Sequence, residues 1–419
     1  MIYLVVGAGP AGVVAAEHLR KLDPLANITI VGSEPEPPYS RMAIPYFLTD
    51  KIDERGTYLR KTAEHYQSLD INVVNKRVDS IDTDLNRVIT EDGEAFRYDK
   101  LLLATGASPS VPPVPGIDLP GVHNCWTLKD AREIVRLAAP GASVVLMGAG
   151  FIGCIILESL ALRDVSLTVV EMENRMVPRM MNDISGNMIK RWCEEKGVAV
   201  NTSTRAESIE QINDGKLRVN LSNGSAVDAD LVISATGVKS NMQFAVDSGL
   251  KADQGILVNE YLQTSNEDIY AAGDVCQGKD FSTGEYSVQA IQPTAVEHAK
   301  FAAGNMVRGH RSEHAGNVNM NVLDTIGLVS ASFGSWMGVE GGESAELVNE
   351  KEYKYLNLQF KDDVLVGASS LGLTQHVGVL RGLIQSQTRL GVWKDRLMKD
   401  PMKIMEAYLS SAQSQVTPA

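Results

Sequence analysis

The chain has 419 residues, of which 44% are hydrophobic and 22% are charged, and its formal net charge at pH 7 is −13. This length exceeds one ordinary hydrophobic core, so two or three domains are expected. The acidic balance argues against a nucleic-acid surface, and no uncharged stretch is long enough to span a membrane. The four cysteines form no CxxC pair, which favours buried hydrophobes in a reducing cytoplasm over metal ligands. We therefore expect a cytoplasmic protein without a metal site.

The beginning of the chain predicts a buried strand, a glycine-rich turn and the start of a helix. In IYLVVGAGPAG, Gly7 permits a sharp turn, Gly9 lets the backbone approach a pyrophosphate, and Gly12 packs the helix against the strand. The helix N-terminus favours the phosphate charge. A second strand, ITIVGSE, ends at Glu34, where an acid can hydrogen-bond a ribose 2′-hydroxyl. We call Gly7–Gly12 the first cradle.

The same pattern recurs in the middle of the chain, where SVVLMGAGFIG supplies Gly148, Gly150 and Gly153. We call Gly148–Gly153 the second cradle. The strand LTVVE then ends at Glu171, whose carboxylate would bind a free 2′-hydroxyl and repel a 2′-phosphate. One such motif is a weak signal, but two with correctly spaced acids indicate two bound dinucleotides. The second cradle therefore favours NAD over NADP, although Arg175 nearby opposes that preference.

Three further segments end in small residues at the expected ends of strands. They are YDKLLLATG at 104–106, ADLVISATG at 235–237 and EDIYAAGDV at 273–274. With these motifs in this order, residues 1–310 resemble the FAD- and NAD-dependent pyridine nucleotide–disulphide oxidoreductase superfamily. The closest branches are the NADH-dependent rubredoxin, ferredoxin and nitrite reductases. The coenzyme A-disulphide reductases and NADH oxidases are also near.

The resemblance implies an α/β fold with two Rossmann-like domains, the NAD domain being inserted in the FAD domain. We expect an FAD domain of residues 1–109 and 242–310, an NAD domain of 110–241, and a small α+β C-terminal interface domain of 311–419. The residues assigned to FAD are Gly7, Gly9, Pro10, Ala11, Gly12, Glu34, Arg41, Val78, Ala104, Thr105, Gly106, Gly273 and Asp274. Those assigned to NAD are Gly148, Gly150, Phe151, Ile152, Gly153, Glu171 and Gly237.

The segment SRMAIPYFL lacks the redox residues that the family often places beside the flavin. By resemblance, Met42 stands at the thiol position of the coenzyme A-disulphide reductases, and a thioether cannot form a thiolate. Tyr46 stands where ferredoxin reductases carry a lysine, and Ile155 where they carry its partner glutamate. Losing both charges together avoids an unpaired buried charge. The residues expected near flavin N5 are Arg41, Met42, Tyr46, Glu158 as a substitute acid, and Gln292 at a family tryptophan position.

Without a thiol, the flavin is the expected resting place for electrons, since it accepts a hydride and releases electrons singly. The leading hypothesis is an NADH:acceptor oxidoreductase that exchanges electrons with an iron–sulfur protein or with an iron–sulfur subunit of a larger complex. The flavoprotein subunit of a tungsten-dependent aldehyde oxidoreductase would fit, with flow towards NAD⁺. The alternatives are a self-sufficient NADH oxidase or diaphorase, and an NADH-responsive flavoprotein that acts by partner binding.

The C-terminal part carries a basic segment in an acidic protein. Between Arg381 and Lys403 there are six cations and two carboxylates. Asp400-Pro401 predicts a helix start, with Leu397, Met398, Met405 and Leu409 as an apolar face. A basic face could be solvated, or it could steer an acidic iron–sulfur carrier. Oligomer or complex formation is expected, and the candidate docking residues are Arg389, Lys394, Arg396 and Lys399.

Overall fold

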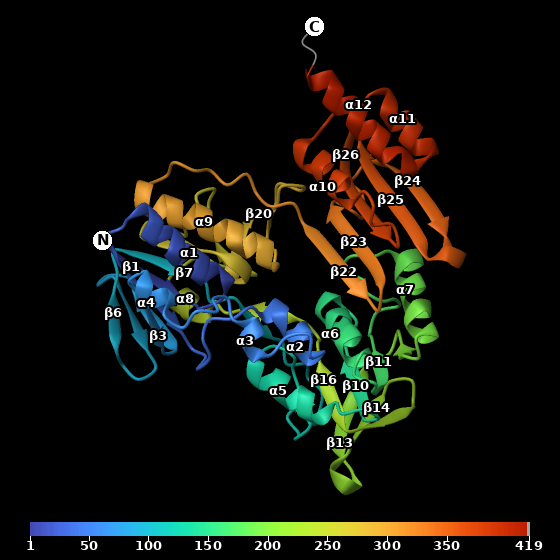
Figure 1. The fold of residues 1–419 in the computed structure, drawn as a ribbon, viewed down its shortest axis with the longest axis horizontal. Coiled ribbons are helices and arrows are strands. Elements are labelled where there is room, and N and C mark those ends of the chain that lie inside the picture. The colour runs from blue at the N-terminus through green and yellow to red at the C-terminus, as the bar shows by residue number, and fades with distance from the viewer. Residues whose placement is uncertain (417–419) are drawn as a thin grey trace. The chain divides into compact units, whose positions relative to one another are not determined.

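The structure, a computed structural model, describes residues 1–416 and divides the chain into two compact units (Figure 1). The first unit contains Met1–Ser108, Val238–Asp280 and Gly284–Asn317. The second contains Pro109–Gly237, Phe281–Thr283 and the described residues from Val318 onward. Within residues 1–416, no helix combines the length and apolar character that crossing a membrane requires.

The first unit is built on a five-stranded parallel sheet in the order β19-β7-β1-β2-β3. Its strands read as apolar runs because both faces are covered, and Leu101, Leu102 and Leu103 are fully buried. Helices α1 and α9 pack against each other in this unit. The bounds are β1 Ile2–Val6, α1 Pro10–Leu22, β2 Asn27–Gly32, β3 Ile71–Asn75, β7 Lys100–Leu103, β19 Ile269–Ala271 and α9 Gln292–Arg308.

Smaller elements complete the first unit. An antiparallel sheet has the order β4-β5-β6, and another small sheet has the order β18-β20-β21. Their bounds are β4 Val78–Asp82, β5 Arg87–Thr90, β6 Ala95–Arg97, β18 Ile256–Leu257, β20 Cys276–Lys279 and β21 Tyr286–Ser287. The short helices are η1 Arg41–Ala43, α2 Ile44–Leu48, α3 Glu54–Thr57, α4 His65–Ser68, α8 Gln243–Asp247 and η3 Gly273–Val275.

The second unit repeats the parallel arrangement with a sheet in the order β12-β11-β10-β16-β9. An antiparallel meander, β13-β14-β15, packs on it and shares its hydrophobic core. The bounds are β9 Val122–His123, α5 Leu128–Leu137, β10 Ser143–Met147, α6 Phe151–Ala161, β11 Ser166–Val170, α7 Asp183–Glu195, β12 Ala199–Asn201, β13 Ala206–Gln211, η2 Asn213–Gly215, β14 Leu217–Leu221, β15 Ala226–Ala229 and β16 Leu231–Ser234.

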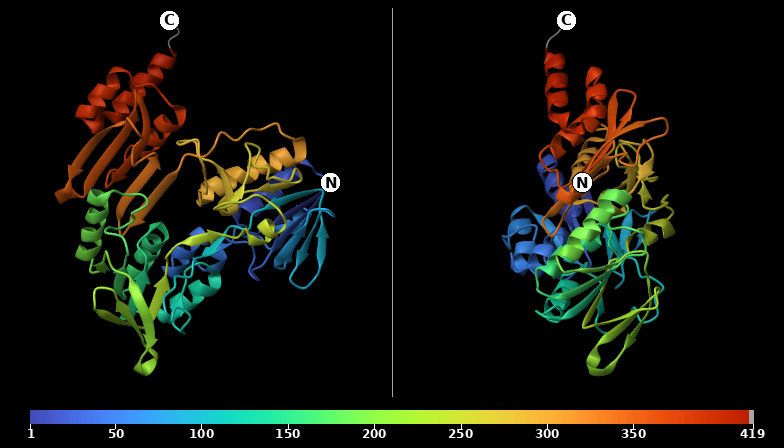
Figure 2. Two further views of the ribbon diagram at one scale, coloured as in Figure 1. Left: turned by 180° about the vertical axis from the view of Figure 1, so that it is seen from behind. Right: turned by 90° about the vertical axis from the view of Figure 1, so that its right-hand side faces the viewer.

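The rest of the second unit is a five-stranded antiparallel sheet in the order β22-β23-β26-β25-β24. Figure 2 shows helices α10–α12 gathered beside this sheet, and a core that includes Phe333, Leu358 and Ile384 joins the two. The bounds are β22 Met320–Thr325, β23 Leu328–Gly334, β24 Glu343–Asn349, η4 Glu350–Glu352, β25 Lys354–Lys361, β26 Val364–Leu371, α10 Val377–Ser386, α11 Val392–Lys399, η5 Pro401–Lys403 and α12 Ile404–Val416.

Polar contacts join the two parts of the second unit. On α7, Arg191 donates to the Glu350 carbonyl at 2.8 Å, and the Trp192 indole donates to the Ile326 carbonyl at 3.2 Å. The Tyr353 hydroxyl donates to the Glu195 carboxylate at 2.5 Å. These contacts and the packing of α6 on β22 account for the grouping of both parts in one unit.

The predicted fold class is confirmed, since the chain contains two parallel dinucleotide-type sheets and a smaller α+β part. Strands β8 (Ala107–Pro109) and β17 (Val238–Ser240) pair where the chain passes between the two units. The division into three domains at 109, 241 and 310 stays a prediction.

Candidate functional site

The glycines of the first cradle divide into two that are fixed by packing and one that faces open space. A Cβ on Gly7, whose φ is +117°, would lie 2.1 Å from the Ala104 carbonyl oxygen. A Cβ on Gly12 would lie 1.9 Å from the Gly7 carbonyl oxygen. A Cβ on Gly9 would meet nothing within 4 Å, and Pro10 follows it as the first residue of α1. The free space at this helix N-terminus fits a pyrophosphate.

The second cradle reproduces this geometry. A Cβ on Gly148 (φ +97°) would lie 2.6 Å from the Ala235 carbonyl oxygen, and one on Gly153 would lie 2.1 Å from the Gly148 carbonyl oxygen. Gly150 again faces open space. Phe151 and Ile152 form the first turn of α6, and their assignment to NAD stays a prediction. Gly237, with φ +121°, lies just after β16 in the matching loop.

Several of the predicted FAD residues lie beside the first cradle, and the assignment of the whole set to FAD stays a prediction. Gly273, with φ +76°, packs where a Cβ would lie 3.4 Å from the Ala11 Cβ atom. The Thr105 hydroxyl donates to the Asn241 carbonyl at 2.8 Å, and Gly106 adopts a φ of +66°. Val78 begins β4 and packs at the edge of the same core. Burial raises the pKa of the Asp274 carboxyl, an effect that the Arg41 guanidinium opposes.

Glu34 and Arg41 form an ion pair next to this cradle. The Arg41 guanidinium donates to the Glu34 carboxylate at 2.6 Å, and it also donates to the Tyr39 hydroxyl at 2.8 Å. The Tyr39 hydroxyl in turn donates to Glu34 at 2.5 Å. Sequence reasoning missed Tyr39, although its position two residues before Arg41 in the PPYSR turn was a usable signal. This network fixes the Glu34 carboxylate, which retains further lone pairs for a ribose.

The residues expected near flavin N5 fall in both units. Met42 and Tyr46 lie one turn apart in the η1–α2 segment and are 47% and 54% exposed. Gln292 begins α9, and its side-chain oxygen accepts from the Ser40 hydroxyl at 2.5 Å. Ser40 is another residue that sequence reasoning missed. Glu158 is half-buried on α6 of the second unit, so it belongs to a different unit from the other candidates.

Glu171 lies at the second cradle with its carboxylate against the glycine loop. It is 7% exposed and accepts from the Ala149 amide at 2.6 Å and the Glu173 amide at 2.8 Å. Arg175, the cation that could favour a 2′-phosphate, donates to the Met181 carbonyl at 2.9 Å and to the Asp183 carboxylate at 2.8 Å. Because its guanidinium is engaged, Arg175 competes weakly with Glu171.

The four cysteine thiols are free of disulfides, and Cys154, Cys193 and Cys276 are buried. Burial raises the pKa values of Cys125, Cys193 and Cys276 to about 12. The pKa of Cys154 is also raised, and its thiol donates to the Ala149 carbonyl at 3.5 Å. A thiol with such a pKa is protonated at neutral pH and is a poor nucleophile.

Two cradles of matching geometry, each at the end of a parallel strand, define an oxidoreductase that binds two dinucleotides. The family described as pyridine nucleotide-disulphide oxidoreductase matches residues 1–302, and the chain belongs to this family. Its members use FAD and NAD(H). The predicted family, its enzymatic class and its cofactors are therefore confirmed.

Two curated relatives extend beyond the family match. The chain is 31% identical over 411 residues to the NADH-dependent phenylglyoxylate dehydrogenase subunit epsilon of Aromatoleum evansii, covering 97% of each chain. It is 27% identical over 387 residues to the rubredoxin-NAD(+) reductase of Pseudomonas putida, covering 92% of this chain and 99% of that one. Among solved structures, an NAD-dependent persulfide reductase from A. fulgidus is 28% identical with a TM-score of 0.85. That match covers 94% of this chain and 78% of the reductase.

We expect NADH to be preferred over NADPH because of the Glu171 charge. Glu171→Gln keeps a hydrogen-bond acceptor but removes the repulsion between the carboxylate and the 2′-phosphate of NADPH. The ratio of kcat/KM for NADH to kcat/KM for NADPH should therefore fall by roughly tenfold or more. The measurement is steady-state reduction of a small dye with each nucleotide. Arg175→Leu serves as the control and should leave the ratio nearly unchanged. A wild-type enzyme that uses NADPH at least as well as NADH would contradict this assignment.

Proposed function

We propose that this flavoprotein passes electrons between NAD(H) and an iron–sulfur carrier, or an iron–sulfur subunit of a larger oxidoreductase, without a thiol relay. The observation that carries the proposal is that no cysteine thiol is set up to react as a thiolate at neutral pH. All four thiols have raised pKa values, and the position that aligns with the family thiol is Met42, whose side chain is exposed. The FAD of this family therefore needs an external electron partner, since it can exchange hydrides and single electrons.

The relatives support a partner of this kind. One is named as a subunit of an NADH-dependent dehydrogenase, and the other as a reductase of rubredoxin. In a dehydrogenase complex, electrons from the oxidised organic substrate would flow through this chain towards NAD⁺. A tungsten-dependent aldehyde oxidoreductase is one such partner enzyme, and it remains part of the proposal together with a free carrier.

The basic segment supplies a candidate docking face. Arg396 and Lys399 lie on the exposed side of α11, opposite the buried Leu397. Arg389 is 83% exposed and lies 3.5 Å from the Asp363 carboxylate. Lys394 differs from the prediction, because it contacts the Glu343 carboxylate and its side chain is only 15% exposed. The proposed docking face therefore comprises Arg389, Arg396 and Lys399.

The proposal is tested by purifying the chain anaerobically from its own cells. We expect iron and acid-labile sulfide to co-purify with FAD, and the co-purified iron–sulfur polypeptide to exchange electrons with NAD(H) through this chain. Rapid oxygen consumption by the isolated chain, with no iron in the native preparation, would instead support a self-sufficient NADH oxidase.

Replacing all four cysteines with alanine should leave electron transfer intact. Each buried replacement is expected to cost about 1 kcal/mol of stability through lost packing. Flavin reduction by NADH, followed by stopped-flow absorbance, should retain the wild-type rate, as should onward transfer to the iron–sulfur partner. Normal flavin reduction combined with lost onward transfer, in a folded variant, would show that a cysteine relays electrons.

A further inference from the structure

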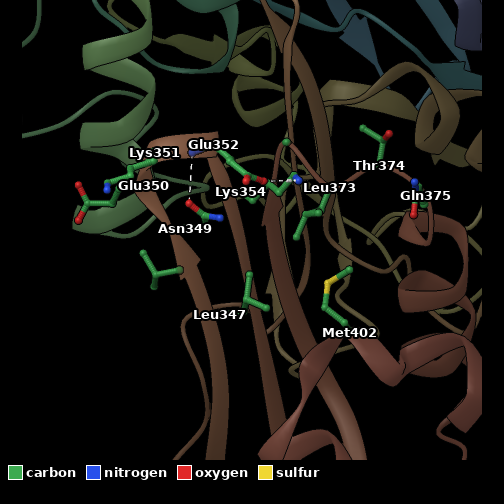
Figure 3. Close-up of a pocket in the computed structure, with 12 residues that line it drawn as sticks. Leu347, Asn349, Glu350, Lys351, Glu352, Lys354, Leu373, Thr374, Gln375 and Met402 are labelled. Carbon is green, nitrogen blue, oxygen red and sulfur yellow. Dashed lines mark hydrogen bonds and ion pairs between the residues drawn. The ribbon is translucent and has the colours of Figure 1, made fainter.

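The C-terminal part of the second unit has an open groove at the end of β24 (Figure 3). Two lysines and two glutamates line it, so their charges balance and select no particular ligand. The polar groups beside the first cradle are arranged more selectively, because a hydroxyl there fixes the direction of a side-chain amide.

The carboxyl edge of the first sheet sets the order in which the parts of a dinucleotide can lie. Strand β2 leads to Glu34, β7 leads to Ala104 and β19 leads to Gly273, while β1 leads to the first cradle. The sheet order places β7 and β19 on the side of β1 that is away from β2. An adenosine ribose at Glu34 and a pyrophosphate at the first cradle therefore direct the flavin half of FAD towards β7 and β19.

Helix α9 begins on this flavin side of the first cradle. A Cβ on Gly273 would lie 3.2 Å from the Ala295 Cβ atom and 3.4 Å from the Ala11 Cβ atom. Ala295 is in the first turn of α9 and Ala11 is in the first turn of α1, so the two helices begin side by side at the loop that follows β19. Gln292 is the first residue of α9 and therefore lies where the flavin half is expected.

The Gln292 side-chain amide is held in one orientation. Its oxygen accepts from the Ser40 hydroxyl at 2.5 Å, and Ser40 is only 9% exposed. The NH2 group of Gln292 has no hydrogen-bond partner among the residues whose side chains the structure describes. Because its oxygen is engaged, the amide presents its N–H donors away from Ser40.

Ser40 is itself fixed by its neighbours in the chain. Its amide donates to the Thr57 carbonyl at 3.0 Å, and its backbone is extended, with φ −96° and ψ 120°. In an extended chain, successive side chains point to opposite faces. Tyr39 and Arg41, on either side of Ser40, both bond Glu34, whereas the Ser40 hydroxyl points the other way. The hydroxyl therefore keeps its direction without further support.

We propose that Ser40 is a positioning residue that holds the Gln292 amide so that its N–H donors, and not its oxygen, face the flavin half of FAD. Donors fixed beside a group that gains negative charge stabilise its charged form. Reduced FAD carries more negative charge than oxidised FAD, so the fixed amide raises the reduction potential. Without the Ser40 hydroxyl the amide can rotate and present its oxygen, which repels that charge. The identity of the electron partner does not enter this inference.

The inference is tested on the reduction potential of FAD bound to the full chain, measured by anaerobic titration against a reference dye with FAD in excess. Ser40→Ala should favour oxidised over reduced FAD by about tenfold, which is about 30 mV for a two-electron couple. Gln292→Leu removes the donors and should lower the potential at least as much. Adding Ser40→Ala to Gln292→Leu should shift the potential no further, because Ser40 acts only through Gln292.

Thr57→Val is the matched control. Thr57 is buried next to the Ser40 backbone, and its hydroxyl donates to the Glu54 carbonyl at 2.7 Å, so its loss should leave the potential unchanged. A wild-type potential in Ser40→Ala or in Gln292→Leu would overturn the inference. Shifts that add in the double variant, or an equal shift in Thr57→Val, would show that Ser40 only supports the fold.

Discussion

Gly9→Val should give a folded protein that is purified without flavin, whereas Gly150→Val should keep its flavin and lose reduction by NADH. Both glycines have extended backbone angles, with φ near −78° and −73°, which a valine can adopt. A Cβ added to either glycine would have no neighbouring atom within 4 Å. The added side chain would therefore occupy only the space in which each dinucleotide's pyrophosphate is expected.

The two variants serve as controls for each other, since the same change is made in two cradles of the same shape. Flavin content is measured by absorbance after gel filtration, and NADH binding by anaerobic titration. Circular dichroism should report wild-type secondary structure in both. Flavin retained by Gly9→Val, or flavin lost only from Gly150→Val, would show that the cofactors are assigned to the wrong cradles.

A third glycine shows why position within the motif matters. Gly7→Ala should destabilise the first unit, because its Cβ would lie 2.1 Å from the Ala104 carbonyl oxygen, closer than any real contact. Loss of flavin in that variant would report misfolding and carry no information about the pyrophosphate. The sequence motif predicts a packing role for Gly12 and an open position at Gly9, and the structure adds the distances: a Cβ on Gly7 or Gly12 would meet backbone atoms, whereas one on Gly9 would meet nothing within 4 Å.

Local patterns were sufficient to predict the parts that depend on neighbouring residues. Both cradles, their strands and the acids that follow them lie within single βαβ segments, so spacing determined them. The helix start predicted at Asp400-Pro401 is also a local feature. Asp400 caps η5, and its carboxylate accepts from the Met402 amide at 3.1 Å. These features required no knowledge of distant contacts.

Contacts between residues that are far apart in the sequence could not be predicted from local patterns. The partners Ser40 and Gln292 are 252 residues apart, and Lys394 and Glu343 are 51 residues apart. The predicted apolar face was also partly wrong. Leu397 is buried, but Leu409 is 52% exposed. Helix α11 ends at Lys399 and η5 begins at Pro401, so the side chains after this point do not continue the spacing of α11. Ile404 and Ala407 therefore face the core in place of Leu409.

Reversing the charges of the docking face should slow electron exchange with the iron–sulfur partner by a factor of about 10 to 10³ at low salt, the range over which steering changes association rates. The variant combines Arg389→Glu, Arg396→Glu and Lys399→Glu. Rates are measured with the co-purified iron–sulfur polypeptide over a series of salt concentrations. The wild-type rate should fall steeply with salt, whereas the variant rate should be nearly flat, because screening removes an attraction that the variant lacks.

Reduction of a small neutral dye by NADH distinguishes lost docking from lost folding, since the dye needs only access to the flavin. Arg396 lies 4.4 Å from the centre of the Trp393 ring, and losing that contact should cost only about 0.5–1 kcal/mol at an exposed site. The dye rate should therefore stay near wild type. Equal losses with dye and carrier would indicate damaged folding. An unchanged carrier rate would mean that these cations are merely solvated and that the partner meets the protein elsewhere.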